Sequence, residues 1–260
     1  MKIGIVTDIH YGPDVETRLG SQAPAQLRTF GEAMRALAPA CLLDLGDRIN
    51  DVTADKDREH TTWVRRTLTE IGVPVYHVFG NHDVANLSKR ELGATLGKWA
   101  AYEYVDLDGI RLVLLDSQDP TVERIGGALG TEQLAWLSST IRGSRQPCLI
   151  FCHHPLDEQA VDGHWYFEAH PGHAHAGNRE NARRIFEKGG RVLAVFSGHM
   201  HWTRATMING IPYVTIGSIV DGGFTKGRPC GAFAEVTVDG GTVGVRVAGL
   251  LPDRFEFGRL

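Results

Sequence analysis

The sequence lacks several features that would each define a class of protein. Its four cysteines form neither a C-x-x-C motif nor a disulfide-dense pattern: Cys41, Cys148, Cys152 and Cys230. No apolar run approaches the roughly 20 residues that a transmembrane helix needs. The first residues, MKIGIVTD, reach a charge too early for the apolar region of a signal peptide. We therefore expect a cytoplasmic protein with reduced cysteines and no membrane partner.

The chain also lacks an excess of charge of one sign. Its 260 residues carry 27 basic and 31 acidic side chains, which gives a formal net charge of −4 at pH 7. Such a chain has no bulk electrostatic attraction for nucleic acid, so we do not expect a nucleic-acid partner. It has no low-complexity tract, linker or internal repeat, which favours a single domain over residues 1–260. Histidine, in contrast, is abundant, with 12 copies.

Short apolar runs alternate with helical patterns over the first 200 residues. The runs are rich in Val, Ile and Leu, which is typical of buried strands: 2–7, 41–45, 75–79, 110–115, 148–152 and 192–196. The helical patterns lie between them, at about 24–38, 60–71, 131–142 and 179–188. This alternation predicts an α/β domain. After residue 200, apolar runs joined by Asn209-Gly210 and by 239–241 predict antiparallel hairpins, and thus two packed sheets flanked by helices.

Polar residues gather just beyond five of the predicted strands. In open α/β sheets the functional crevice lies beyond the carboxyl ends of the strands, so these distant segments are expected to converge. They contain two carboxylates, four imidazoles and one amide: Asp8, His10, Asp47, Asn81, His153, His199 and His201. This set suits two adjacent cations, and imidazole-rich sites favour Mn, Fe, Zn or Co over Mg or Ca. Because the set holds no cysteine, we do not expect a structural zinc site.

The order D-x-H, G-D-x-x-N, G-N-H-D, H-x-P, G-H-x-H resembles that of the calcineurin-like metallophosphoesterase superfamily. The resemblance implies an α/β fold built as a four-layer α/β/β/α sandwich of two packed mixed sheets flanked by helices. It also implies two divalent or trivalent metal ions, with Mn, Fe or Zn favoured. One ion would be held by Asp8, His10, Asp47 and His201, and the other by Asp47, Asn81, His153 and His199. We choose His153 over His154 because the family ligand stands two residues before the proline.

The resemblance further implies that His82 is not a metal ligand. It would assist the leaving oxygen during attack by a metal-bound hydroxide, and Asp83 would orient it. The compact length and the His153-His154-Pro155 segment resemble the bacterial phosphodiesterase branch, which includes cyclic-nucleotide and glycerophosphodiester hydrolases. We therefore predict a small phosphate-ester substrate, with a phosphodiester favoured. A phosphomonoesterase, a nucleoside-diphosphate-type pyrophosphatase, a DNA nuclease and an inactive metal-binding scaffold stay as alternatives.

The loop at about 162–178 is rich in aromatic and histidine residues. We predict a lid that contacts the substrate, and the candidate substrate contacts are Tyr11, Arg48, His154 and Trp165. The alternative is a surface loop whose aromatic side chains pack on the domain, and a third metal at His173 and His175 is less favoured. Homo-oligomer formation is left open.

A few further histidines and tryptophans are assigned no chemistry. His77 is expected in the core, and His60 is expected to face solvent at the start of a helix. Trp63, Trp99 and Trp136 are expected to pack.

Overall fold

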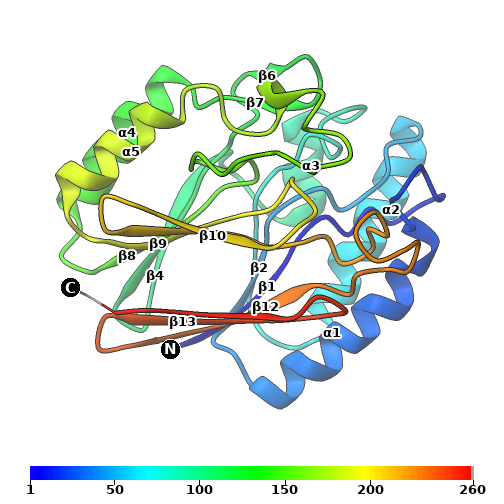
Figure 1. Ribbon diagram of the computed structural model, residues 1–260, viewed down its shortest axis with the longest axis horizontal. Coiled ribbons are helices and arrows are strands. Elements are labelled where there is room, and N and C mark those ends of the chain that lie inside the picture. The colour runs from blue at the N-terminus through cyan, green and yellow to red at the C-terminus, as the bar shows by residue number, and fades with distance from the viewer. Residues whose placement is uncertain (259–260) are drawn as a thin grey trace.

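The computed structural model describes residues 1–258, and two six-stranded mixed sheets dominate it (Figure 1). The first sheet has the order β14-β13-β12-β1-β2-β3. Its strands, in chain order, are β1 Lys2–Val6, β2 Cys41–Asp44, β3 Val75–His77, β12 Phe233–Asp239, β13 Thr242–Ala248 and β14 Asp253–Phe257. The second sheet has the order β10-β11-β9-β8-β5-β4. Its strands are β4 Glu103–Leu107, β5 Ile110–Leu114, β8 Cys148–Phe151, β9 Val192–Ser197, β10 Arg204–Ile208 and β11 Ile211–Thr215.

Five helices cover the outer faces and ends of the sheets (Figure 1). They are α1 Ala23–Leu37, α2 Ala54–Thr69, α3 Lys89–Leu96, α4 Thr131–Gly143 and α5 Arg179–Gly189. Two 3₁₀ turns and a small hairpin lie in the loops: η1 Gly20–Gln22, η2 Pro171–His173, β6 Thr121–Val122 and β7 Gly126–Gly127. Within residues 1–258, no helix combines the length and the apolar character needed to cross a bilayer.

Strand alternation sets the order of the layers. Successive side chains of a strand point to opposite faces, so Leu42 and Leu43 of β2 pack in different cores. Leu43 joins Phe151 of the second sheet in the core between the sheets. Leu42 packs with residues of α1 and α2, whereas Ile150 packs with residues of α4 and α5. Helices therefore flank both sheets, and the predicted four-layer α/β/β/α sandwich is confirmed.

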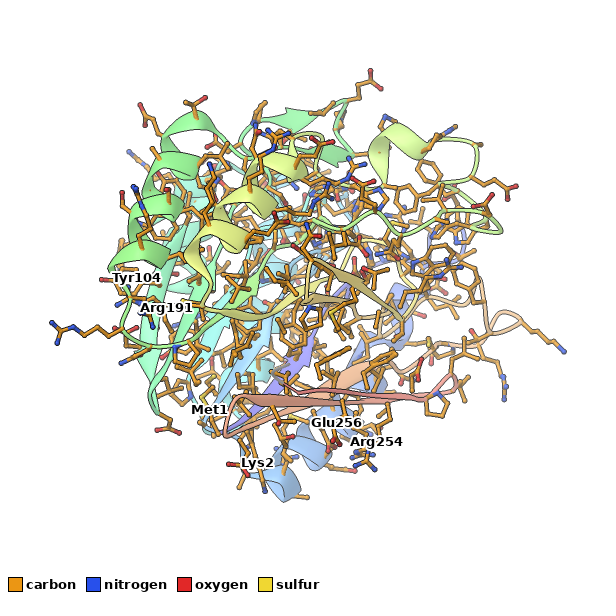
Figure 2. All side chains as sticks on the ribbon, turned by 60° about the vertical axis from the view of Figure 1, so that its left-hand side comes forward. Met1, Lys2, Tyr104, Arg191, Arg254 and Glu256 are labelled. Carbon is orange, nitrogen blue, oxygen red and sulfur yellow. The ribbon has the colours of Figure 1, made fainter. Side chains whose placement is uncertain are left out.

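The C-terminal region is divided between the two sheets. β12, β13 and β14 extend the first sheet antiparallel to β1. The exposed Arg254 and Glu256 of β14 alternate with Phe255 and Phe257, which pack on the core between the sheets (Figure 2). β10 and β11 form the predicted hairpin around Asn209-Gly210, but β11 runs parallel to β9. The prediction of a wholly antiparallel tail is wrong because β11 joins the second sheet after a crossover.

Some local expectations also need correction. Trp99 was expected to pack, but its side chain is 89% exposed after the end of α3. His60 lies in the middle of α2, not at its start, and is half-buried against the ring of Tyr11. The capping residue of α2 is Thr53, whose side chain accepts from the backbone N–H of Lys56. His77 is buried as expected.

Candidate dinuclear metal site

The predicted ligands converge because β1, β2 and β3 are parallel in one sheet and β8 and β9 are parallel in the other. The backbone turns sharply where these strands end. Five of the seven predicted ligands have positive φ: Asp8 (50°), His10 (45°), Asp47 (52°), His199 (70°) and His201 (55°). A left-handed backbone costs roughly 1–2 kcal/mol for a residue with a side chain. Such conformations cluster at functional sites, where the surrounding structure enforces them.

One group of candidate ligands consists of Asp8, His10 and His201, whose ligand atoms lie within 4.8 Å of one another. Nε2 of His10 and Nε2 of His201 face each other at 3.0 Å. Oδ1 of Asp8 is 3.4 Å from Nε2 of His201 and 3.9 Å from Nε2 of His10. Two imidazole nitrogens and a carboxylate oxygen directed at one buried point form the donor set that a borderline divalent cation prefers.

The second group consists of Asp47, His153 and His199. Oδ2 of Asp47 is 3.3 Å from Nε2 of His153 and 3.9 Å from Nε2 of His10 in the first group. Oδ1 of Asn81 is 3.2 Å from Nε2 of His153. Asp47 therefore lies between the groups, at the position of a bridging carboxylate. All seven predicted ligands come together, and the residues fit two metal ions.

The second ring nitrogens of three histidines are held by hydrogen bonds. Nδ1 of His153 donates to the backbone oxygen of Leu45 at 2.9 Å, and Nδ1 of His201 donates to Asp221 at 2.8 Å. Nε2 of His199 donates to the backbone oxygen of His173 at 3.0 Å, which leaves Nδ1 of His199 as its ligand atom. Metal-ligating histidines almost always have such an outer partner, which fixes the tautomer and the ring orientation. Among residues 1–258, His10 has no such partner for its Nδ1.

Glycines bring the two carboxylates close to the backbone of neighbouring motifs. A Cβ on Gly198 would lie 2.6 Å from Oδ2 of Asp8, and a Cβ on Gly80 would lie 2.2 Å from Oδ1 of Asp47. Asp8 accepts from the backbone N–H of His199 at 3.0 Å, and Asp47 accepts from that of His82 at 2.8 Å. Glycine is therefore required at positions 80 and 198, because a side chain at either would clash with the carboxylate of Asp47 or Asp8.

Nearby carboxylates raise the pKa of two of the candidate ligands, His153 and His201. Burial alone lowers the pKa of His201, but hydrogen bonds to Asp221 and Asp8 outweigh it and raise the pKa to about 10. Burial is likewise outweighed at His153, where Asp47 raises the pKa to about 9. Binding a cation at these nitrogens therefore displaces protons, as expected for metal sites.

A ligand atom of His82 also lies within 4.8 Å of those of His10 and Asp47, so His82 adjoins both groups. Its ring is held by two side chains that no prediction included. Nδ1 donates to the carboxylate of Asp51, and Nε2 accepts from Nη1 of Arg18 at 2.7 Å. This hydrogen bond to His82 lowers the pKa of Asp51. Asp51 therefore fixes the His82 ring, whose Nε2 is directed into a cavity above the candidate ligands.

The prediction that Asp83 orients His82 is wrong. The buried carboxylate of Asp83 accepts from the backbone N–H groups of Asp47, Arg48 and Gly80 at 2.9–3.0 Å. It also pairs with the guanidinium of Arg48 at 2.6 Å. Asp83 therefore links the motif at 46–50 to its own motif at 80–83 by hydrogen bonds and an ion pair.

Three of the four predicted substrate contacts do not line the cavity. Arg48 is fully buried and pairs with Asp44 at 2.5 Å as well as with Asp83. Tyr11 stacks on Trp63 and lines a separate hollow. His154 is fully buried and bonded to Ser117 and to the backbone oxygen of Ile125. These placements contradict direct roles for Tyr11, Arg48 and His154 in binding.

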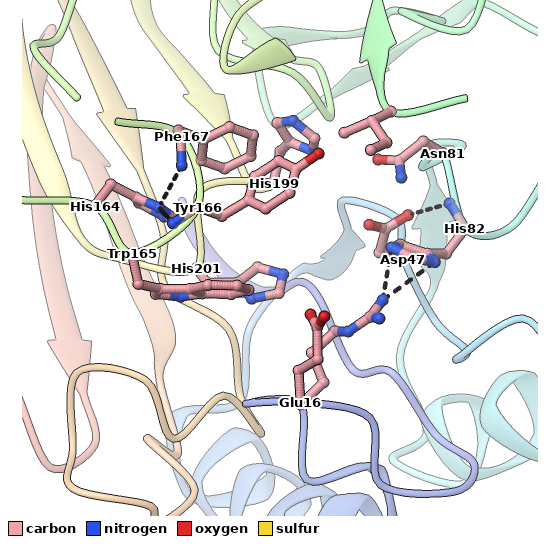
Figure 3. A pocket seen from close by; sticks show the side chains of 12 residues that line it. Glu16, Asp47, Asn81, His82, His164, Trp165, Tyr166, Phe167, His199 and His201 are labelled. Atoms are coloured by element: carbon pink, nitrogen blue, oxygen red, sulfur yellow. Dashed lines mark hydrogen bonds between the residues drawn. The ribbon is translucent and has the colours of Figure 1, made fainter. Parts of the chain in front are cut away.

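The fourth predicted contact, Trp165, lines a cavity of about 270 Å³ above the candidate ligands (Figure 3). Five of its lining residues are predicted site residues: Asp47, Asn81, His82, His199 and His201. Residues 164–167 also line it, together with Glu16 and Arg18. The loop at 162–178 combines both expected roles, since Phe167 packs with Met200 in a small core while Trp165 faces the cavity.

Four further residues belong to the site although no prediction included them: Glu16, Arg18, Asp51 and Asp221. Asp221 follows β11 in a loop, so the rule that polar residues gather beyond strand ends applies to it as well. Asp51 directly follows the second motif. Glu16 and Arg18 lie in an irregular segment where no sequence signal distinguishes them from other surface charges.

Comparison with known proteins agrees with this geometry. The model of the family described as "Calcineurin-like phosphoesterase" matches residues 1–203. A protein of Synechococcus sp. named "Probable cyclic nucleotide phosphodiesterase" is 28% identical over 60% of this chain and 58% of its own length. A Xenopus tropicalis protein named "Manganese-dependent ADP-ribose/CDP-alcohol diphosphatase" is 31% identical over 41% of this chain and 35% of its own length. The match thus spans less than two thirds of either relative.

A solved structure shares the fold over its full length. The crystal structure of a dimetal phosphatase from Danio rerio has a TM-score of 0.80, covers 100% of this chain and 99% of its own, and is 18% identical. At this identity the likeness concerns the fold.

Proposed function

The chain belongs to the calcineurin-like phosphoesterase family, and we propose that it hydrolyses small phosphodiesters with two metal ions. The observation that carries the proposal is the pair of ligand groups that meet at Asp47 below a cavity. We assign the ions to Asp8, His10, Asp47 and His201, and to Asp47, Asn81, His153 and His199. Mn, Fe or Zn suits this mixed N/O donor set.

A dinuclear centre supplies charge stabilisation for phosphoryl oxygens and a nucleophilic water at neutral pH. The residues of the chain perform the other tasks. His82 faces the cavity, and Asp51 holds its Nδ1. Its Nε2 accepts from Arg18 in the neutral ring, so His82 donates to the leaving oxygen when both ring nitrogens carry a proton and Arg18 has turned to a phosphoryl oxygen. Arg18, beside Nε2 of His82, offers a cation to a phosphoryl oxygen. Asp221 and the backbone oxygens of Leu45 and His173 hold the imidazoles in place.

A diester is favoured over a monoester by the composition of the cavity. A diester carries a second organic group, and Trp165, Tyr166 and Phe167 give the cavity an aromatic wall on which such a group can pack. The Synechococcus relative is also named as a phosphodiesterase. A diphosphatase is the second candidate, because the Xenopus relative is named as one and because the cation of Arg18 suits a further phosphate.

The test uses protein treated with EDTA and reloaded with Mn²⁺, Fe²⁺ or Zn²⁺. The substrates are bis(p-nitrophenyl) phosphate, p-nitrophenyl phosphate, cyclic AMP and ADP-ribose. We expect metal-dependent cleavage with bis(p-nitrophenyl) phosphate preferred over the monoester. A preference for the monoester refutes the diester assignment, and a preference for ADP-ribose over both diesters favours the diphosphatase. No cleavage with any of the metals favours the inactive scaffold.

A further inference from the structure

Two loops form the outer part of the cavity, beyond the candidate metal ligands. Glu16 comes from the segment that follows the first motif, and Trp165 and Tyr166 come from the loop at 162–178. Figure 3 shows the carboxylate of Glu16 directed into the cavity, with Trp165 on one side and His82 on the other. The proposed hydrolysis assigns no task to Glu16, although a carboxylate repels a phosphate.

Glu16 stands at a backbone position that favours glycine. Val15 and Arg18 exchange backbone hydrogen bonds of 2.9 and 3.0 Å, which close a two-residue turn over Glu16 and Thr17. The φ of Glu16 is +52°. Tight turns with positive φ at the first central residue prefer glycine, because a side chain there is strained. The conformation of the turn therefore does not favour glutamate at position 16. A function of its carboxylate in the cavity accounts for this residue.

The aromatic wall beside Glu16 is held in position. Trp165 packs so closely on Gly223 that a Cβ there would lie 2.9 Å from Nε1 of the indole, yet the side chain stays 42% exposed. Burial and then the negative charge of Glu16 raise the pKa of the Tyr166 hydroxyl, so the two side chains interact electrostatically. Arg18, the cation of this cavity wall, is directed at His82.

A carboxylate attracts cations, and so do the faces of Trp and Tyr rings, because the ring faces carry negative potential. We propose that Glu16, Trp165 and Tyr166 form a subsite for a quaternary or protonated amine on the alcohol that the phosphodiester retains after cleavage. The retained alcohol is the relevant one because His82, which serves the leaving oxygen, lies across the cavity from Trp165 (Figure 3). This inference rests on the proposed function and narrows its substrate class to diesters of amino alcohols.

The test compares two diesters with the same leaving group and nearly the same shape. p-Nitrophenyl phosphorylcholine carries a quaternary nitrogen, and p-nitrophenyl 3,3-dimethylbutyl phosphate carries carbon in its place. With Mn²⁺-loaded enzyme we expect kcat/KM to be about tenfold higher for the choline ester, which corresponds to about 1.4 kcal/mol. We expect Glu16→Gln and Glu16→Gly to bring this ratio close to one. Asp162→Asn is the control, since it removes an exposed carboxylate of the loop at 162–178 that does not line the cavity, and its ratio stays near ten.

Glu16→Gly also separates function from folding. Because the turn favours glycine, we expect its melting temperature to equal or exceed that of the wild type while the ratio falls. A wild-type ratio near one, or a high ratio that persists in Glu16→Gln, overturns the subsite. Calorimetric binding of phosphorylcholine and of its 3,3-dimethylbutyl analogue tests the subsite without turnover. If no p-nitrophenyl ester is cleaved, the proposed function fails, and the same binding preference still decides the subsite.

Discussion

His82 and Asp51 form a hydrogen-bonded pair in which Nδ1 of the imidazole donates to the carboxylate. Asp51 directly follows the second motif, and His82 belongs to the third, so the pair joins loops after β2 and β3. The remaining ring nitrogen of His82 faces the cavity, next to Arg18. A carboxylate placed in this way keeps the imidazole in one tautomer and one orientation.

We expect His82→Ala to reduce turnover by about 10²–10⁴-fold, the usual contribution of a positioned proton donor. Metal content, measured by elemental analysis after gel filtration, should stay close to that of the wild type. Because the loss arises from proton donation, it should be larger for alkyl esters, whose leaving groups are basic, than for p-nitrophenyl esters. Equal loss of metal and activity would make His82 a ligand.

Asp51→Asn should lower kcat while KM changes little, because Asp51 acts on the substrate only through His82. We expect a loss of about 10–100-fold for alkyl esters and a smaller one for p-nitrophenyl esters. Asp55→Asn is the matched control, since it removes a nearby exposed carboxylate that pairs with Arg58 on α2. A uniform loss with both types of leaving group would contradict a positioning role.

Asp221→Asn should weaken metal binding by about 10–100-fold, the usual effect of losing an outer partner of a ligating histidine. Asp221 holds Nδ1 of His201 and in turn accepts from the hydroxyl of Thr17 at 2.7 Å. Calorimetric titration with Mn²⁺ gives the affinities, and Asp239→Asn at the exposed end of β12 is the control. Unchanged affinity in Asp221→Asn would refute this role.

Gly198→Ala should both destabilise the protein and impair the first group of ligands. The added methyl group would lie 2.0 Å from Oγ1 of Thr7 and 2.6 Å from Oδ2 of Asp8, so the buried carboxylate must shift. Overpacking of this kind costs about 1–3 kcal/mol. Gly172→Ala, where nothing lies within 4 Å of the added Cβ, is the control for both thermal unfolding and metal affinity. Equal behaviour of the two variants would show that the close approach at Gly198 is unimportant.

We expect the free energy of unfolding to decrease as the pH is lowered, partly because of His164. Its Nδ1 accepts from the backbone N–H groups of Tyr166 and Phe167, and its Nε2 donates to the backbone oxygen of Met200. Burial lowers the pKa of His164 to about 4. The unfolded chain, with a pKa near 6.5, then binds more protons, so this contribution is complete above about pH 6.5 and is lost as the pH falls to about 4.

The loss from His164 amounts to about 1.4 kcal/mol per pH unit within that window. Denaturant unfolding of the wild type and of His164→Gln at several pH values measures it. We expect the wild type to lose stability more steeply than the variant between pH 6.5 and 4. Parallel curves would show that His164 titrates normally in the folded protein.

The sequence by itself determined the layers and the seven candidate ligands. Successive side chains of a strand point to opposite faces, so Leu42 and Leu43 lie in different cores. Polar residues that follow parallel strands lie at the same edge of a sheet. These are local rules, so they can be applied to each segment separately. The same rules did not assign α3, and they missed the parallel pairing of β11 with β9, because strand pairing depends on segments far apart in the chain.

Only the tertiary structure decided which charged side chains support the ligands and which face the cavity. Arg48 and Asp83 stand in the motifs, yet both are buried and pair with each other. Asp51 and Glu16 stand outside them, yet one holds His82 and the other enters the cavity. A long charged side chain reaches whichever partner the packed loops bring near, and burial decides whether it meets protein or solvent. That choice depends on distances between loops, which no single segment of the sequence contains.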